Sequence, residues 1–190
     1  MKQLAAVIFC VLAFVLACEA RAADTYKADP IHSSALFRAK HANASYVWGR
    51  FNDPTGTFVL DESSPSNSSF MVEINVNNVD THNEKRDAHL KSPDFFNARQ
   101  YPTITFKSTS VTKGTGNVLQ VTGELKMHGV AKTVTMPVEL TGMGEFPPGV
   151  KRAGVEATFV VQMSSFEIKG LPGAVSDDIK VIVALEGVKQ

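Results

Sequence analysis

Apolar and polar residues alternate along the second half of the chain. Between residues 119 and 127 every second residue is apolar or glycine, and the residues between them are polar. The same alternation returns at residues 133–141, 155–163 and 181–185. A period of two is typical of strands that rest one face on a core and leave the other in water. The pattern therefore predicts four half-buried strands.

Short turn signals separate these segments, among them Gly114 with Gly116, the pair His128-Gly129, and a glycine- and proline-rich stretch at residues 144–149. Earlier strands are predicted at residues 33–41, 48–53, 56–60, 70–76 and 103–112. The total is eight or nine strands with short connections, and strands joined by short turns are antiparallel. An antiparallel sheet of this size closes into a barrel or splits into a sandwich.

Residues 81–101 interrupt the β pattern. Thr81 and Glu84 have the spacing of a capping box, which predicts a short helix that begins at Thr81 and runs to about Leu90. Residues 92–96 read as a further turn, with a serine cap and a proline in the first position. This insert carries Phe95 and Phe96, which are too apolar for a free loop and are expected to pack against one end of the sheet.

The N-terminus has the features of a signal peptide. Lys2 precedes an unbroken apolar run from residue 4 to residue 16, which is short for a bilayer span, and Ala20-Arg21-Ala22 fits a cleavage site. Residues 1–22 are therefore predicted to be removed, which implies a periplasmic or secreted protein. Two alternatives are an uncleaved anchor and a lipoprotein attached through Cys18, because residues 15–18 resemble a lipobox.

The mature chain, residues 23–190, has the composition of one globular domain. Both cysteines lie in the targeting segment, so the mature domain contains neither a disulfide nor a thiol nucleophile. Of the 19 basic and 19 acidic residues, Lys2, Arg21 and Glu19 leave with residues 1–22, so 17 basic and 18 acidic residues remain. This near-neutral balance predicts no bulk electrostatic attraction to nucleic acid or to anionic membranes. No later segment is long and apolar enough to be a transmembrane span, and a homodimer is left open.

Catalytic and metal-binding motifs are weak. His82 and His89 share a helix face but lie about 10 Å apart along its axis, which is too far for one zinc ion. His32 and His41 would point to opposite faces of one strand. The chain has no G-x-S-x-G elbow and no glycine-rich phosphate loop. We therefore expect no metal, no cofactor and no enzymatic activity.

Four segments of the mature chain are specific when taken together. They are residues 26–33 with Phe37, His41 and residues 49–51, then 87–96, then 101–108, and finally 121–130 followed by Lys132-Thr133-Val134. In this order, with a signal peptide before them and covering nearly the whole mature chain, they resemble the YceI-like family of exported polyisoprenoid-binding proteins. The chain departs from the family at residues 163–168, where the family commonly has an Arg-x-Asp/Glu-Phe-Gly turn.

The resemblance implies an extended, lipocalin-like antiparallel β-barrel of about eight strands that binds a long apolar or amphiphilic lipid, such as a polyisoprenoid, a quinone or a fatty acyl derivative. Apolar alternation alone fits a cavity and a solidly packed barrel equally well. Two other functions remain open, an interaction scaffold without ligand and a lipid-modifying enzyme. The residues expected to form the cavity walls and its gate are Phe37, Phe51, Val72, Ile74, Leu90, Phe95, Phe96, Phe106, Leu125, Val138, Leu140, Phe159 and Val183.

Overall fold

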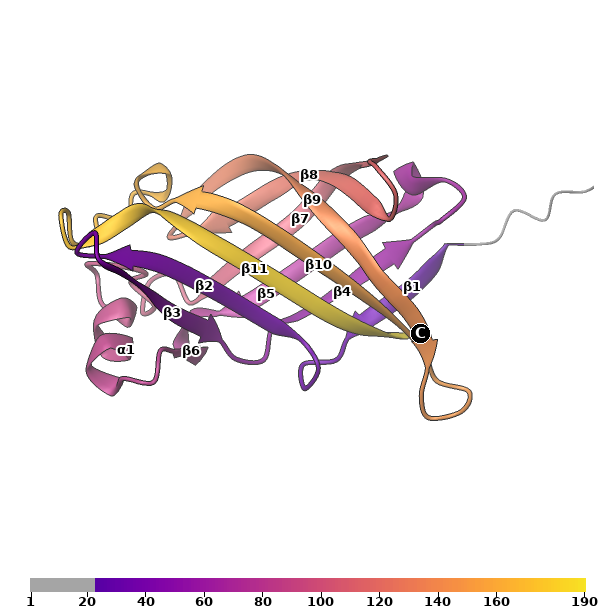
Figure 1. Cartoon of the computed structure of the whole chain (residues 1–190), viewed down its shortest axis with the longest axis horizontal. Helices are drawn as coiled ribbons and strands as arrows, with labels where there is room; N and C mark the ends of the chain where they lie inside the picture. Colours follow the sequence, from indigo (N-terminus) through magenta and orange to yellow (C-terminus); the bar gives the residue numbers. More distant parts are fainter. Residues whose placement is uncertain (1–22) are drawn as a thin grey trace, which may run out of the picture.

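The computed structural model describes residues 23–190 and shows one elongated, all-β barrel with a single short helix at one end (Figure 1). The predicted signal peptide and Cys18 lie outside the described residues. The strands are β1 (Asp24–Ala28), β2 (Ser34–His41), β3 (Ser45–Phe51), β4 (Thr55–Leu60), β5 (Ser69–Asn75), β6 (Val79–Asp80), β7 (Thr103–Lys113), β8 (Val118–Met127), β9 (Val130–Glu145), β10 (Lys151–Gln162) and β11 (Val175–Lys189). The helix is α1 (Glu84–Lys91), and three 3₁₀ turns are Pro65–Asn67, Val76–Asn78 and Ser164–Phe166.

All pairings are antiparallel, and eight strands close a ring in the order β1-β4-β5-β7-β8-β9-β10-β11, with β11 returning to β1. The remaining strands, β2, β3 and β6, continue the sheet from the other end of β11. They extend β1, β4 and β5 respectively, because β2 pairs with β3 as β1 pairs with β4, and β3 pairs with β6 as β4 pairs with β5. The prediction of about eight antiparallel strands in a closed barrel is confirmed.

At three of the eight positions in the ring the strand is interrupted and continues as a second strand. The sequence pattern predicted separate strands at 48–53 and 56–60 but not that one continues the other. The breaks fall at residues 29–33, 52–54 and 76–78. Two of them lie side by side, since the amide of Asn52 donates to the carbonyl of Asn78 at 3.0 Å. Pro54, fully buried at one break, has no amide to give to the ladder. The ladder is therefore interrupted here. β6, with two residues, is too short to show alternation, whereas β1 alternates between buried and exposed residues but was not predicted.

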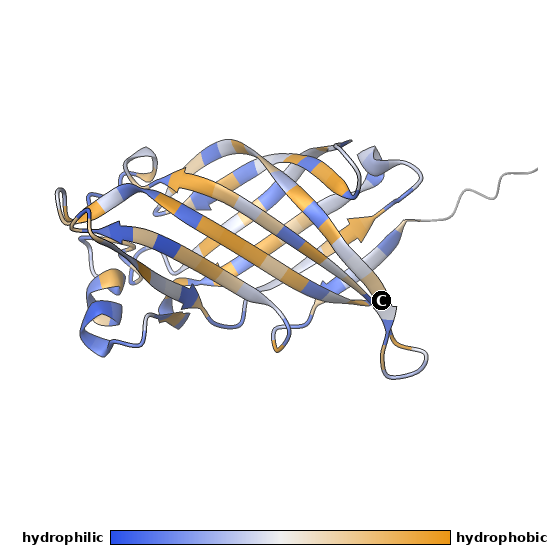
Figure 2. Ribbon diagram, in the orientation of Figure 1, coloured by the Kyte–Doolittle hydropathy of each residue, from blue (hydrophilic) through white to orange (hydrophobic). Residues whose placement is uncertain are grey.

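The long late strands follow the sequence pattern closely. Figure 2 shows apolar and polar bands alternating along β10 and β11. Between β8 and β9 the two-residue loop His128-Gly129 has positive φ at both positions, 52° and 80°, as a type I′ hairpin requires. A Cβ at Gly129 would lie 2.6 Å from Cε1 of Tyr101, so glycine also makes room for that ring. The observed strands differ from the predicted ones mainly in being longer, with β11 extending well beyond residues 181–185.

The helix starts differently from the prediction. Asn83, not Thr81, is the N-cap, and its side chain accepts a hydrogen bond from the amide of Arg86. Thr81 is buried and its hydroxyl instead donates to Asp87, while Arg86 donates to the Thr81 hydroxyl. The capping-box prediction was wrong because this threonine is already committed to partners inside the helix.

Within residues 23–190, no helix has both the length and the apolar character needed to cross a bilayer.

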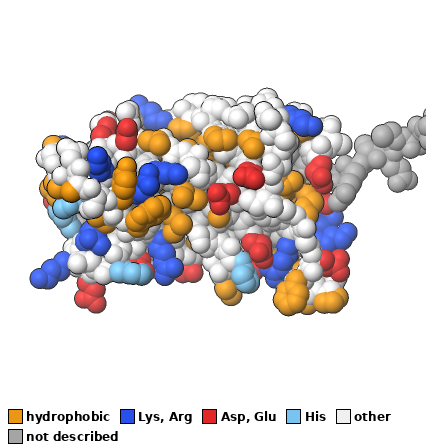
Figure 3. Space-filling view, in the orientation of Figure 1, with side chains coloured by type: hydrophobic (Ala, Val, Ile, Leu, Met, Phe, Trp, Pro, Cys, Tyr) orange, Lys and Arg blue, Asp and Glu red, His pale blue; other side chains and the backbone are white. Residues whose placement is uncertain are grey.

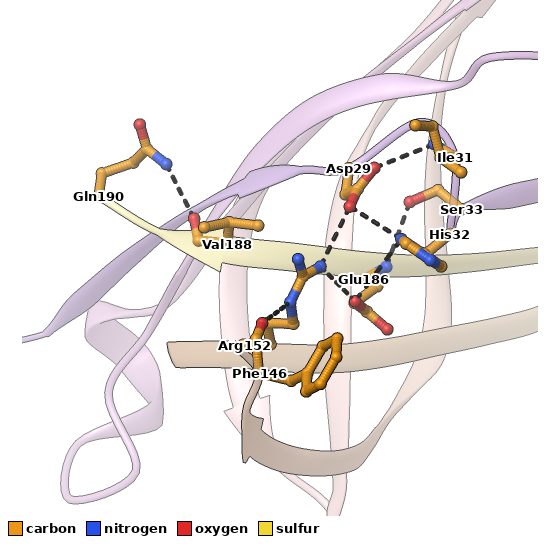
Figure 4. A network of polar contacts seen from close by, with 9 residues as sticks. All are labelled: Asp29, Ile31, His32, Ser33, Phe146, Arg152, Glu186, Val188 and Gln190. Carbon is orange, nitrogen blue, oxygen red and sulfur yellow. Dashed lines mark hydrogen bonds and ion pairs between the residues drawn. The ribbon is translucent and has the colours of Figure 1, made fainter. Parts of the chain in front are cut away.

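An ion network ties the closing strands together (Figure 4). Arg152 on β10 contacts Asp29, just after β1, at 3.1 Å and Glu186 on β11 at 2.6 Å. The ring of His32 donates to the Asp29 carboxylate at 2.9 Å. Hydrogen bonds from His32 and then Arg152 lower the pKa of Asp29 from 3.8 to about 2. The folded barrel therefore holds Asp29 ionised at pH values where the unfolded chain is protonated.

This network predicts an acid-dependent loss of stability. Because the folded pKa of Asp29 is depressed, its contribution is complete above about pH 4 and disappears as the pH falls towards 2. We expect Asp29→Asn to unfold more easily than the unsubstituted protein at neutral pH, with the difference shrinking below about pH 4. Urea unfolding of both proteins across this range measures it. A constant difference at every pH would contradict the assignment.

Candidate functional site

The barrel encloses a cavity of about 170 Å³ whose wall is entirely apolar. All strands of the closed ring except β1 and β4 contribute to it, together with β2, β3 and the segment around α1. The lining residues are Ala35, Leu36, Phe37, Ala39, Phe51, Phe70, Val72, Ile74, Leu90, Phe95, Phe96, Ile104, Phe106, Leu125, Met127, Met136, Val138, Val155, Ala157, Phe159, Val161, Met163, Ile168, Val175, Ile179, Val181, Val183 and Leu185. The barrel is therefore hollow and not packed solid.

Twelve of the thirteen residues predicted from the sequence lie on this wall. They are Phe37, Phe51, Val72, Ile74, Leu90, Phe95, Phe96, Phe106, Leu125, Val138, Phe159 and Val183. The exception is Leu140, whose placement on the wall was wrong. Leu140 pairs with Val155 at a register shift in β10. It packs against the core cluster around Tyr26 and Phe58, which lies at the end of the barrel away from α1. Its side chain faces inward, but at a level where the barrel is already full.

That filled end is built on stacked aromatic rings. Tyr26 stacks on Phe58 with 5.3 Å between ring centroids, and Phe58 stacks on Phe70 at 6.2 Å. Gly187 makes room for them, because a Cβ there would lie 2.6 Å from the Phe58 ring. Phe58 is 1% exposed. The rings close the cavity at the end of the barrel that carries the C-terminus (Figure 1).

At the other end, the insert around α1 supplies part of the wall. Phe96 meets Phe51 edge-on at 5.5 Å, and Phe51 lies 5.5 Å from Phe37, so three rings form a continuous row. Phe95 is buried and packs edge-on against His89 at 5.0 Å. The expectation that Phe95 and Phe96 pack against one end of the barrel is confirmed. Whether they act as a gate remains a prediction.

A second segment that the sequence reasoning did not select borders the cavity at this end. Met163, Ile168 and Val175 line both the cavity and an open outer groove, whose other walls are Ser164, Glu167, Lys169, Pro172 and Asp177. We call residues 163–177 the mouth loop. Its two ends are joined by Asp177, which accepts hydrogen bonds from the amide and hydroxyl of Ser164 at 2.7 and 2.6 Å. The amide of Gly170 donates to the carbonyl of Asp94, which links this loop to the insert.

The mouth loop contains the residues at which the chain departs from the family pattern. Phe166 is buried in the 3₁₀ turn, and Glu167 follows it with a left-handed φ of 58°. The ring of His128 donates to the Phe166 carbonyl at 3.1 Å and so fixes this turn to the β8–β9 hairpin. Although its sequence departs from the family pattern, this loop is held by specific contacts on the rim of the cavity.

The histidines do not converge on one site. His82 lies 3.1 Å from Asp80 and His89 lies 3.0 Å from Asp94, so this helix-face pair contacts two separate carboxylates. Among residues 23–190, Asp29, His32 and Glu186 form a group whose ligand atoms lie within 4.8 Å of one another. The guanidinium of Arg152 contacts both of these carboxylates. The group is therefore best explained as an ion network that closes the barrel.

Comparisons with known proteins agree with this geometry. The family model described as the YceI-like domain matches residues 26–187. "Protein YceI" of Escherichia coli O157:H7 is 42% identical over 191 residues, covering 100% of this chain and 98% of the relative. Among solved structures, Burkholderia cenocepacia BcnA superposes with a TM-score of 0.77 at 23% identity and covers 84% of this chain and 98% of its own.

A further solved structure carries a functional description. It is a polyisoprenoid-binding domain from Saccharophagus degradans, implicated in plant cell wall breakdown, with a TM-score of 0.69 at 14% identity. It covers 87% of this chain and 98% of its own, and at this identity the likeness concerns the fold. The family match, by contrast, spans nearly the whole described chain and is accompanied by close sequence identity to YceI. The chain therefore belongs to the YceI-like domain family.

Proposed function

We propose that this barrel binds one long apolar or amphiphilic lipid, of polyisoprenoid, quinone or fatty acyl type, for carriage or sequestration. The observation that carries the proposal is the hollow, wholly apolar interior of about 170 Å³. A dry apolar cavity of about 150 Å³ is enough to admit a benzene molecule. A longer chain fits if it threads along the barrel axis and the flexible side chains at the rim, such as Met163, shift.

The energetics favour a hydrocarbon ligand over a polar one. Each methylene removed from water contributes roughly 0.8 kcal/mol, so a long tail supplies a large gross term against the cost of ordering it. A buried polar group would meet no hydrogen-bonding side chain on this wall and would lose several kcal/mol on leaving water. The name of the Saccharophagus degradans domain, polyisoprenoid-binding, supports the same class of ligand.

The interior also favours binding over catalysis. The wall presents no carboxylate, imidazole or hydroxyl that could act as a general acid, a base or a nucleophile on a bound chain. We also propose that the protein acts outside the cytoplasm, in the periplasm or beyond, since residues 1–22 have the pattern of a signal peptide. The intact mass of the mature protein tests this, and a mass showing a lipid on Cys18 would establish the lipoprotein alternative.

The test of the binding proposal is mass spectrometry of an organic extract of the purified full chain. We expect an apolar lipid at close to one molecule per barrel, released only after unfolding. An extract without lipid, together with failure to take up added polyprenol, quinone or fatty acid, would favour a scaffold. Chemical conversion of an added lipid would instead establish an enzyme.

A further inference from the structure

Two aromatic side chains and three cations gather on the outer surface of β2, β3 and β11. Trp48 is 49% exposed and Tyr46 is 53% exposed. The guanidinium carbon of Arg38 lies 4.0 Å from the centre of the Tyr46 ring and 5.5 Å from that of Trp48. Together with Lys40 and Lys180 these residues form what we call the basic–aromatic patch.

The strand registers place all five side chains on one face. Arg38 stands directly opposite Trp48 on β3 and opposite Lys180 on β11. Lys40 stands opposite Tyr46. Directly opposed residues of an antiparallel pair project to the same side of the sheet, and residues two apart on one strand do so as well.

This face is the outside of the cavity wall. The neighbours of Arg38 on β2, Phe37 and Ala39, line the cavity, and so do the neighbours of Lys180 on β11, Ile179 and Val181. Because successive side chains of a strand point to opposite faces, the patch points into solvent. Figure 3 shows basic and apolar side chains mixed over this part of the surface.

The cations of the patch lack acidic partners. Within residues 23–190, Arg38, Lys40 and Lys180 form no ion pair, and the buried Nε of Arg38 has no hydrogen-bond partner. By contrast Arg50, next along β3, lies 3.5 Å from Asp80. The described chain as a whole is nearly neutral, with 17 basic and 18 acidic residues after residue 22. The three cations of the patch are therefore available to an external anionic group.

We propose that the basic–aromatic patch docks the barrel on an anionic lipid membrane. Tryptophan and tyrosine are the residues that prefer the membrane–water interface. Lysine and arginine beside them are attracted by anionic headgroups. Because the chain has no overall basic charge, docking depends on this local cluster, and the exposed Trp48 and Tyr46 rings beside its cations favour a membrane interface over a nucleic-acid surface. This inference rests on the proposed lipid binding, for which a membrane is the source or the destination of the ligand.

The patch lies next to the mouth loop. The amide of Lys40 donates to Ser176 at 3.0 Å, and the amide of Ala42 donates to the carbonyl of Ala174 at 2.7 Å. Val175, between these two contacts, lines both the cavity and the outer groove. A barrel docked through the patch therefore brings its mouth close to the bilayer.

The experiment uses Trp48, the one tryptophan of the chain, as its own reporter. Mature protein is mixed with vesicles of phosphatidylcholine containing one third phosphatidylglycerol, and separately with vesicles of phosphatidylcholine alone. We expect the anionic vesicles to bind the protein, shift its tryptophan emission to the blue and protect it from acrylamide, with an effect that weakens as salt is added. The neutral vesicles should produce little change.

Charge reversal tests the position of the surface. The double variant Lys40→Glu/Lys180→Glu should weaken binding to the anionic vesicles about tenfold or more. The matched control Lys107→Glu/Lys126→Glu makes the same charge change at two exposed lysines on β7 and β8, on the far side of the ring, and should leave most of the binding intact. Circular dichroism confirms that each variant is folded.

Three results would overturn the proposal. One is an unsubstituted protein whose tryptophan emission ignores anionic vesicles. Another is an equal loss of binding in both charge-reversal variants. The third is binding that depends on two exposed loop-tip residues and not on the patch. These are Ile31, which is 86% exposed, and Phe146, which is 75% exposed. Retention of extractable lipid by Lys40→Glu/Lys180→Glu separates the two proposals, since docking can fail while the cavity still binds.

Discussion

Replacement of Ala157 with phenylalanine is expected to abolish lipid binding while the barrel remains folded. Ala157 lies in the middle of β10, is 8% exposed and lines the cavity. A phenyl ring projecting from this position would occupy much of a space of about 170 Å³. Filling an existing cavity costs less than overpacking a solid core, which is typically about 1–3 kcal/mol. The loss of ligand should therefore far exceed the loss of stability.

The matched control is Thr158→Phe, which places the same ring one residue further along β10. Thr158 is exposed and projects to the opposite face of the strand. Lipid recovered in an organic extract, and uptake of an added polyprenol, are measured for both variants beside the unsubstituted protein. We expect Thr158→Phe to retain its ligand. Equal retention by Ala157→Phe would place the lipid elsewhere, and loss in both variants would point to a general defect.

The inward-facing residues of the long strands could be predicted because a half-buried strand must alternate. Val138, Phe159 and Val183 lie on the cavity wall, as the period of two required. The same pattern could not distinguish residues that line the cavity from residues that fill the closed end of the barrel. Leu140 and Val138 are two residues apart on β9, so both are predicted to face inward. That difference depends on how far along the axis Tyr26 and Phe58 fill the barrel, which is a property of strands that are distant in sequence.

Local signals were misleading where a residue has long-range or competing partners. Thr81 had the spacing of a helix cap, but its hydroxyl is used by Asp87 and Arg86. The two residues of β6 are too few for a period to be visible, and the five-residue β1 was not predicted although its burial alternates. Their positions are fixed by pairing with β4, β11 and β3.

The mouth loop was missed for a related reason. Four strands, β7 to β10, separate residues 163–177 from the insert in sequence, and only the closed fold brings Gly170 to Asp94. A Cβ at Gly170 would lie 3.0 Å from Cε of Met163 and 3.6 Å from the Phe95 ring. The two segments therefore meet closely at the rim, and an opening between them needs both to separate.

Because the insert and the mouth loop meet at Phe95, the double variant Phe95→Ala/Phe96→Ala is the decisive test of gating. Truncating a fully buried phenylalanine typically costs about 3–5 kcal/mol, and we expect a stability loss of this order, mostly from buried Phe95. If the two rings also hold the insert against the mouth loop, bound lipid should leave about tenfold faster, a change equivalent to about 1.4 kcal/mol in the barrier to release.

Phe58→Ala provides the control for stability alone. It removes the same ring from the plugged end, where the side chain is 1% exposed and does not line the cavity. Both variants are first shown by circular dichroism to be folded, and release of a fluorescent polyprenyl analogue is then followed in stopped flow. We expect fast release from Phe95→Ala/Phe96→Ala and an unchanged rate from Phe58→Ala, because only the first change loosens the rim. Similar release rates from both variants would leave Phe95 and Phe96 as ordinary packing without a gating role.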